Sequence, residues 1–162
     1  MRCLLKELSD YLEINNRSPS GLVWKKSPGA KINAGDPAFT TVTRSGYYAG
    51  KFCGARLSAH VVVFFLHNGF LPKGEVDHID GDRTNNDPKN LRDVSRSVNA
   101  QNRKKAKGYS FHKRINKYIA TINEPGTGKR LHLGYFENEI DARKAYLTAK
   151  KSLHIGYVGE HS

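Results

Sequence analysis

Residues 76–102 read VDHIDGDRTNNDPKNLRDVSRSVNAQN, and they carry most of what the sequence says about fold and chemistry. A short apolar start predicts a strand, which enters a loop over residues 78–89 that is rich in Asp, Asn and Gly. Residues 91–94 can return as the second strand of a hairpin. Ser95 is a good N-cap for a helix that we expect to run to about Lys105.

Two adjacent residues, Asp77 and His78, stand at the end of the first of these strands. Adjacent side chains on a strand point in opposite directions, so one can bind a metal ion while the other faces an attacking water molecule. Phosphodiester cleavage needs such a base together with a divalent cation. Asn99 lies on the following helix, and amide and carboxylate oxygens from Asn99 and Asp77 suit Mg²⁺ or Mn²⁺. An EF-hand loop beginning at Asp77 is excluded, because Gly81 would be fifth and Pro88 twelfth, where that pattern requires Gly sixth and Glu twelfth.

The same segment resembles the HNH endonuclease family, in its phage and intron-associated homing branch, where Asn replaces the last His of the name. The resemblance covers residues 58–103 and includes the core xDHxDGxxxNNxxxNLR at 76–92 and NxQN at 99–102. It implies a ββα-metal fold that holds one divalent ion, Mg²⁺ or Mn²⁺, because Asn in place of the third His favours hard ions over zinc. The roles it implies are metal ligation by Asp77 and Asn99, general-base catalysis by His78, and orientation of the histidine loop by Asn90.

One position departs from the pattern of that branch. His60 stands where a His-Arg-Leu sequence is usual, but Val61 follows it, so the phosphate contact of that arginine is not carried over. We expect His60 and His67 to serve packing rather than ligation. Three further carboxylates are assigned to the structure of the loop: Asp80, Asp82 and Asp87.

The pattern changes after Gly108, where we place a domain boundary. Residues 110–114, 117–123 and 129–136 alternate like strands, and residues 137–153 have the periodicity of a helix. One face of this three-stranded sheet can pack on the helix. The side chains of the other face are suited to hydrogen bonds with base edges in the major groove, although an ordinary solvated face is the alternative. That face consists of His112, Arg114, Ile119, Thr121, Asn123, Arg130 and His132.

Residues 109–154 resemble the ethylene-response-factor type of DNA-binding domain, which also occurs fused to phage HNH nucleases. The residues that carry the likeness are Gly128, Arg130, the run Leu-Gly-Tyr-Phe at 133–136, and the helix start at 139–146. The resemblance implies that the sheet lies in the major groove of DNA. His132 stands where that family usually has Trp, so its base preference is not carried over.

The charge is distributed unevenly along the chain. The net charge is +12, divided into +6 over residues 1–74, −3 over 75–93, +10 over 94–157 and −1 from Glu160. A basic chain with one acidic island indicates a polyanion-binding surface around a cation site, although many basic proteins are simply soluble or ribosome-associated. We expect a basic run after the helix to follow the DNA backbone: Arg103, Lys104, Lys105 and Lys107.

The first part of the chain has weaker patterns. Helical spacing is present over residues 2–13 and a hairpin is indicated over 40–52. Residues 57–66 are apolar at nearly every position, so a buried strand and a helix both remain open, and we favour the helix. Residues 1–57 are either an additional DNA-contacting arm or a scaffold.

The two cysteines, Cys3 and Cys53, form no CxxC pair, which argues against a disulfide framework and a thiolate zinc site. The longest apolar run is far shorter than a membrane span, and the N-terminus is too charged for a signal peptide. We therefore expect a soluble, intracellular protein. The resemblance to phage HNH nucleases implies that it is encoded by a phage and acts in the cytoplasm of a bacterial host.

Together these features predict an α+β protein with a ββα-metal core and a small three-stranded antiparallel sheet carrying one packed helix. The expected parts are residues 1–57, the nuclease core with its basic linker at 58–107, and a DNA-binding domain at 108–162. The predicted function is metal-dependent, homing-type cleavage of double-stranded DNA. One site per chain favours nicking by a monomer. The alternatives are a non-catalytic DNA-binding regulator on a degenerate nuclease scaffold and, more weakly, an RNA-binding protein.

Overall fold

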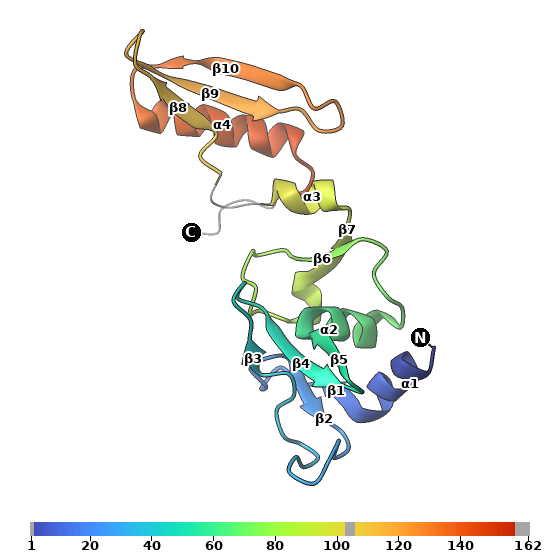
Figure 1. Cartoon of the computed structure of the whole chain (residues 1–162). Helices are drawn as coiled ribbons and strands as arrows, with labels where there is room; N and C mark the ends of the chain where they lie inside the picture. The colour runs from blue at the N-terminus through green and yellow to red at the C-terminus, as the bar shows by residue number, and fades with distance from the viewer. Residues whose placement is uncertain (1, 103–105, 158–162) are drawn as a thin grey trace. The chain divides into compact units, whose positions relative to one another are not determined.

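The computed structural model of the chain describes residues 2–102 and 106–157 (Figure 1). The chain forms two compact units, one ending at Ser95 and the other starting at Arg96. This division comes earlier in the sequence than Gly108, where the composition changes. None of the described helices is long and apolar enough to cross a membrane.

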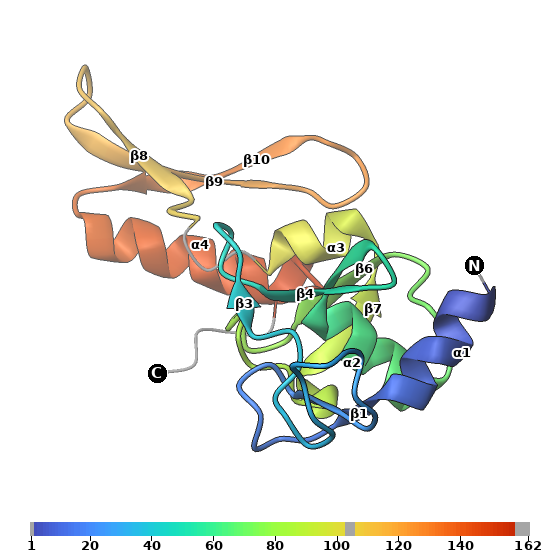
Figure 2. The same cartoon turned by 60° about the horizontal axis from the view of Figure 1, so that its bottom comes forward.

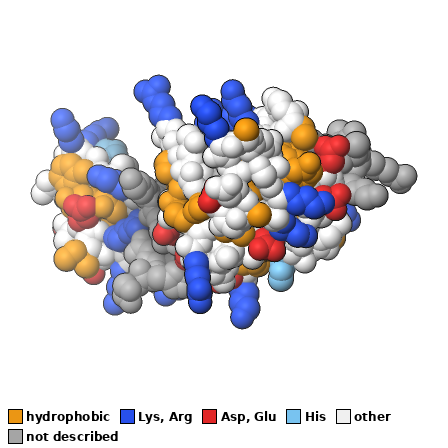
Figure 3. All heavy atoms as spheres, turned by 90° about the horizontal axis from the view of Figure 1, so that it is seen from below, with side chains coloured by type: hydrophobic (Ala, Val, Ile, Leu, Met, Phe, Trp, Pro, Cys, Tyr) orange, Lys and Arg blue, Asp and Glu red, His pale blue; other side chains and the backbone are white. Residues whose placement is uncertain are grey.

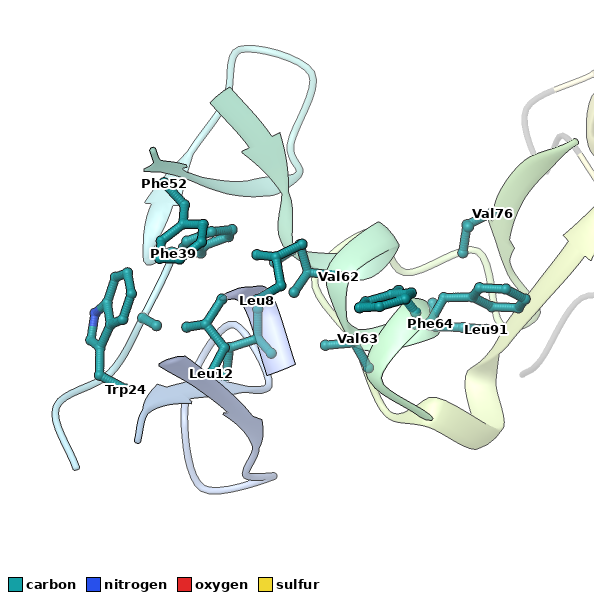
Figure 4. Close-up of a cluster of buried hydrophobic side chains, with 14 residues drawn as sticks. Leu8, Leu12, Trp24, Phe39, Phe52, Val62, Val63, Phe64, Val76 and Leu91 are labelled. Atoms are coloured by element: carbon teal, nitrogen blue, oxygen red, sulfur yellow. The ribbon is translucent and has the colours of Figure 1, made fainter. Parts of the chain in front are cut away.

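The first unit begins with a helix and two small antiparallel sheets. The expected helix near the N-terminus and the expected hairpin are both present, and the sheets have the orders β1-β2 and β3-β4-β5. The elements are α1 (Arg2–Tyr11), β1 (Leu12–Ile14), β2 (Leu22–Trp24), β3 (Thr41–Val42), β4 (Tyr48–Phe52) and β5 (Ala55–Ser58). These short elements share one core, in which Trp24, Phe39 and Phe52 gather beside Leu8 and Leu12 (Figure 4).

Gly50 in β4 is required by a close approach of the backbone to Phe39. A Cβ at residue 50 would lie 2.3 Å from a carbon of the Phe39 ring and 2.9 Å from the Phe39 Cα. Both distances are shorter than van der Waals contact, and a backbone atom cannot move aside cheaply. A glycine at this position therefore lets the aromatic side chain pack directly on the strand.

The apolar segment left open between strand and helix forms helix α2 (Ala59–Asn68). Its end is well defined, since Gly69 adopts φ 78° and its N–H donates to the Phe65 carbonyl at 2.8 Å. Most faces of this helix are apolar, which fits the packing of other elements on more than one side of it. Val62 and Val63 pack within the core shared with the N-terminal strands, and Phe64 lies beside Val76 and Leu91 (Figure 4).

The hairpin that follows α2 carries the candidate site. Strand β6 (Glu75–His78) pairs antiparallel with β7 (Leu91–Val94), and a 3-10 turn, η1 (Pro88–Asn90), leads into the second strand. Val76 and Leu91 are buried against α2, which anchors both strands to the core. The hairpin therefore presents the end of β6 and the connecting loop as parts of a packed unit.

The second unit starts with helix α3 (Arg96–Gln101), directly after Ser95 as expected. The expected extension of this helix to Lys105 falls partly on residues 103–105, which lie outside the described residues. A three-stranded antiparallel sheet of order β10-β9-β8 follows, and α4 lies along one of its faces in both views (Figures 1 and 2). These elements are β8 (Tyr109–His112), β9 (Lys117–Asn123), β10 (Arg130–Phe136) and α4 (Glu139–Leu153).

Local sequence explains the packing of α4 on this sheet. Ala120 and Ile122 of β9 are buried, and so are Ala142 and Tyr146 of α4. Asn138 is the N-cap of α4, and its side chain accepts a hydrogen bond from the Asp141 N–H at 2.9 Å. Three strands and a packed helix therefore form as the alternation and periodicity of the sequence indicate.

The expected α+β class is confirmed in its general form, with four α-helices and small antiparallel sheets among the described residues. Elements β6, β7 and α3 follow one another along the chain in the order expected for a ββα core. Because α3 belongs to the second unit, the packing of that helix on the hairpin stays a prediction.

Candidate active site

Asp77 is a buried carboxylate held by an arginine on the neighbouring strand. Only 7% of the residue is exposed, and it faces Arg92 directly across the β6–β7 hairpin. The Arg92 Nε and Nη2 atoms both donate to Asp77 Oδ2, at 3.0 and 2.7 Å. The guanidinium compensates the buried negative charge and fixes the orientation of the carboxylate.

His78 is buried beside Asp77 but has different surroundings. Its exposed fraction is 3%, and its Nε2 atom lies 3.0 Å from the Asn86 Oδ1. The imidazole also lies against two other rings, with centroid distances of 5.2 Å to His60 and 5.8 Å to Tyr47. Packing and a hydrogen bond therefore both restrain the ring.

His60 joins this cluster from the start of α2. Its ring centroid is 4.8 Å from that of Tyr47, and among the described residues its buried Nδ1 atom has no hydrogen-bond partner. Burial, and secondarily the proximity of His78, lower the pKa of His60 from 6.5 to about 4. His60 is therefore neutral at neutral pH and adds no positive charge beside His78.

The loop after β6 is closed by Asn90. Its Oδ1 accepts from the Asp80 N–H at 3.0 Å, and its Nδ2 donates to the Asp80 carboxylate at 3.0 Å and to the Asn85 carbonyl at 2.8 Å. The Asn90 carbonyl accepts from the Ile79 N–H at 2.9 Å. One side chain thus ties the beginning of the loop to its end, directly beside His78.

The other carboxylates of the loop bond to the loop itself, as expected. Burial alone would raise the pKa of Asp80, but hydrogen bonds from Asn85, the Asp82 N–H and Asn90 outweigh it and lower the pKa. The pKa of Asp82 is lowered mainly by hydrogen bonds from the Thr84 hydroxyl and N–H. Asp87 accepts from the Lys89 N–H at 2.8 Å and caps the 3-10 turn. These groups keep the loop in one conformation.

Asn99, the second expected metal ligand, lies on α3. It belongs to the second unit and Asp77 to the first, so their pairing around one ion stays a prediction. In the part of the chain that the structure describes, no three side chains of His, Cys, Asp or Glu gather as around a metal ion. The expected ligand set would contain just one residue of these types, Asp77, with Asn99, water and phosphate supplying other oxygens.

The open face of the second unit carries most of the polar residues that alternation assigned to it. Cross-strand pairs join Thr121 with His132 and Asn123 with Arg130, opposite the face that packs on α4. His112 ends β8. Arg114 lies in the exposed turn after this strand, so its expected place on the sheet face was wrong, because β8 ends and the turn begins before residue 114. On the face of the molecule shown in Figure 3, Lys and Arg side chains stand out at several places. Of the basic run, Lys107 is exposed, and Arg103, Lys104 and Lys105 lie outside the described residues.

Sequence alternation missed Tyr135 on this open face. Strict alternation over residues 129–136 would put Tyr135 on the same face as Leu131 and Leu133, which is the face that packs on α4. An irregularity between His132 and Gly134 shifts the register, so Tyr135 pairs with Ile119 instead. Its exposed fraction is 56%, and its ring centroid lies 4.6 Å from that of His132. The local sequence signal of this irregularity was a glycine inside a strand, Gly134, whose φ is 137° in the structure.

Sequence reasoning also assigned no role to Arg92 and Asn86, the partners of Asp77 and His78. Both lie inside the quoted motif. Asn86 is the second residue of its asparagine pair, and Arg92 ends its Asn-Leu-Arg sequence. The motif therefore contained the signal, but the partner of each side chain became visible only with the hairpin and loop in place.

Comparison with known proteins gives a match over the segment that contains the β6–β7 hairpin. Residues 58–101 match the sequence profile of the HNH endonuclease family. The matched segment starts just before α2 and ends with α3, so it contains Asp77, His78, Asn90 and Asn99. No curated protein and no solved structure matches the chain. The match indicates a nuclease that acts on DNA, and HNH nucleases generally use a divalent metal ion.

Proposed function

We propose that this protein is a metal-dependent DNA endonuclease of the homing type, in which His78 is the general base and Asp77 and Asn99 bind one Mg²⁺ or Mn²⁺ ion. The observation that carries the proposal is the paired burial of Asp77 and His78 at the end of β6, inside the segment that matches the HNH endonuclease family. Burying two adjacent ionisable groups is unfavourable unless each has its own partners. Arg92 and Asn86 are those partners.

The two side chains have environments that fit two different tasks. The Asp77 carboxylate lies against the Arg92 guanidinium, which compensates a buried negative charge. The His78 imidazole lies 3.0 Å from the Asn86 amide oxygen and against the rings of Tyr47 and His60, with the Asp80 and Asp82 carboxylates of the loop nearby. A carboxylate can then serve as a permanent ligand while the imidazole accepts a proton from the attacking water.

The donor atoms of Asp77 and Asn99 fit a hard divalent cation, since both offer oxygen. When bound, such an ion supplies charge neutralisation at the scissile phosphate and the leaving oxygen. Arg92 orients the Asp77 carboxylate through one oxygen, and Asn90 holds the loop beside His78 in place. These contacts prepare the site in advance, which electrostatic catalysis requires.

The second unit supplies a DNA-binding surface in this proposal. Its open sheet face carries Arg130, Asn123 and Thr121 beside the His132 and Tyr135 rings, which contact each other at a tilted angle. Guanidinium, amide and hydroxyl groups can bond to base edges or phosphates, and the sheet would lie in the major groove. With one catalytic site per chain, a monomer would nick one strand of its target.

The proposal is tested by incubating the protein with supercoiled plasmid and Mg²⁺ or Mn²⁺, with and without a chelator. We expect conversion to open circles that stops when the metal is removed. Asp77→Ala and Asn99→Ala should each weaken Mn²⁺ binding, measured by electron paramagnetic resonance of the free ion. Glu75→Gln is the control, because it removes an exposed carboxylate from the same strand. Absence of metal-dependent nicking with either ion would favour a non-catalytic DNA-binding protein.

A further inference from the structure

Two hydrogen bonds between buried residues connect the proposed catalytic histidine, His78, to Ser20 in the N-terminal part of the chain. His78 Nε2 lies 3.0 Å from Asn86 Oδ1, and Asn86 Nδ2 donates to the Ser20 carbonyl at 2.8 Å. All three residues are buried, with exposed fractions of 3%, 4% and 0%. In a buried site each of these polar contacts has a strong energetic effect, because water cannot replace a lost partner.

The Ser20 contact determines which way the Asn86 amide points. A carbonyl oxygen can only accept a hydrogen bond, so the Asn86 atom 2.8 Å from it must be the amide nitrogen. The amide oxygen then faces His78, and it also can only accept. The proton of a neutral His78 ring must therefore be on Nε2, which leaves the lone pair of the ring on Nδ1.

The turn that supplies the Ser20 carbonyl is itself held by hydrogen bonds. The Asn15 N–H donates to the Gly21 carbonyl at 2.9 Å, and the Gly21 N–H donates to the Ser18 carbonyl at 3.0 Å. The Ser20 hydroxyl donates to the Ala38 carbonyl, which ties the turn to the segment before β3. These hydrogen bonds make residues 15–21 (the 15–21 turn) a stiff support that contacts Asn86 through the Ser20 carbonyl.

Gly21 brings this turn into contact with Asn86. Its φ is +79°, and a Cβ there would lie 3.2 Å from the Asn86 Cβ and 3.3 Å from the Asn86 carbonyl oxygen. Glycine thus permits both the left-handed conformation and the close approach to the catalytic loop.

We propose that Asn86, supported by the 15–21 turn, is a positioning residue that holds His78 in the tautomer protonated at Nε2, so that Nδ1 is the atom that accepts the proton from water. This inference rests on the proposed role of His78 as general base. It makes the N-terminal part of the chain, between β1 and β2, a support of the catalytic site. An isolated neutral imidazole populates both tautomers, so loss of the Asn86 oxygen would release this restraint.

The direct test is ¹⁵N nuclear magnetic resonance of histidine-labelled full-length protein, at a pH where the ring is neutral. We expect the His78 signals of the Nε2-protonated tautomer, with a slowly exchanging Hε2 proton. His78→Gln identifies these signals by their disappearance. A neutral His78 ring protonated at Nδ1 would overturn the inference, and this measurement needs no variant at Asn86.

The variant Asn86→Ala removes the acceptor. We expect the slowly exchanging Hε2 proton to disappear, the Nδ1-protonated tautomer to become populated, and the cleavage rate at saturating DNA to fall about tenfold. Affinities for DNA and Mn²⁺ should stay within twofold. An unchanged Hε2 signal and tautomer in this variant would overturn the inference, whatever happens to the rate. The expected spectra in a wild-type protein that cuts no DNA would support the tautomer assignment and overturn the proposed function instead.

A second pair of variants tests the turn without changing Asn86. Gly21→Ala and Gly35→Ala both place a side chain at a positive φ, of +79° and +90°, but residue 35 has nothing within 4 Å of its Cβ. We expect Gly21→Ala to perturb the His78 signals and to lower the cleavage rate a few-fold, and Gly35→Ala to leave both unchanged. Equal effects from the two variants would show that backbone strain alone is responsible and would overturn the role of the turn.

Discussion

The hairpin β6–β7 and the sheet β8–β10 use polar side chains in opposite ways. In the hairpin, Asp77 and His78 are buried, and each bonds to a specific partner from another segment. In the sheet, Arg130, His132 and Tyr135 are exposed on a face that α4 does not cover. The hairpin therefore resembles a preorganised chemical site, and the sheet resembles a surface for a large polar ligand.

The difference shows where the energetic consequences of a substitution should fall. A buried ionisable group loses its hydration, so removal of its partner affects folding and geometry together. An exposed group keeps its hydration until a ligand arrives, so its removal affects mainly binding. Four predictions test this contrast.

The largest effect is expected from His78→Ala. Loss of a general base should lower the cleavage rate by about 10²- to 10⁴-fold, while DNA affinity stays within twofold. Plasmid nicking and fluorescence anisotropy on the same preparation measure the two quantities. His67→Ala changes a histidine at the end of α2 that is exposed rather than packed as expected, and this variant should cut at the wild-type rate. Wild-type cutting by the His78 variant would refute the assignment of the base.

Arg92→Met should cause the next largest effect, in stability. It removes both hydrogen bonds to Asp77 Oδ2 from a buried carboxylate, so we expect the free energy of unfolding to fall by about 2–3 kcal/mol. Urea denaturation measures the change. The matched variant in the sheet unit is Lys117→Met, which breaks an exposed ion pair with Glu137 and should lose less than about 1 kcal/mol. Equal losses from the two variants would remove the contrast between the units.

Arg130→Ala should weaken DNA binding about tenfold, because it removes a guanidinium from the open sheet face. The cleavage rate at saturating DNA should change less than twofold. Anisotropy titrations at several salt concentrations measure the affinity and its salt dependence. Lys151→Ala removes an equal charge from the last turn of α4 and should have a smaller effect. If both variants weaken binding equally, net charge rather than the sheet face accounts for the affinity.

The smallest effect concerns pH and His60. Because its pKa is about 4 in the folded protein and 6.5 when unperturbed, the unfolded chain binds this proton first as the pH falls. The stability contributed by a neutral, buried His60 is thus complete above pH 6.5 and is lost progressively toward pH 4. Between pH 6 and pH 5 the loss should be about 1 kcal/mol. His60→Phe should reduce this part of the pH dependence in urea denaturation. An unchanged slope would contradict the lowered pKa.

Local patterns predicted much of the fold because they report local geometry. The alternation in residues 117–123, the helical periodicity in residues 137–153 and the N-cap residue type of Ser95 each describe a few neighbouring residues, and the corresponding elements are present. The residue types of the candidate site were visible for a similar reason. Asp77 and His78 are adjacent, and their motif lies within one short segment.

Other features depended on contacts between distant segments. The sequence left residues 57–66 open between a strand and a helix. In the structure, α2 packs both on the N-terminal strands and on the β6–β7 hairpin, and burial on several sides removes the periodic signal. Tyr135 changed face because of an irregularity in strand pairing that alternation does not encode.

Sequence alone was sufficient for the elements of the β6–β7 hairpin, α3 and the three-stranded sheet with α4, and it singled out the segment that matches the HNH endonuclease family, because propensity, capping and motif spacing act over a few residues. It did not predict the small β1–β2 sheet. The partners of Asp77 and His78, the proposed site residues, were decided by tertiary structure. Arg92 reaches Asp77 across a hairpin, and Ser20 reaches Asn86 over 66 positions of sequence. A buried polar group takes its partner from whatever the fold brings within 3 Å, and that proximity is a property of packing rather than of neighbouring residues.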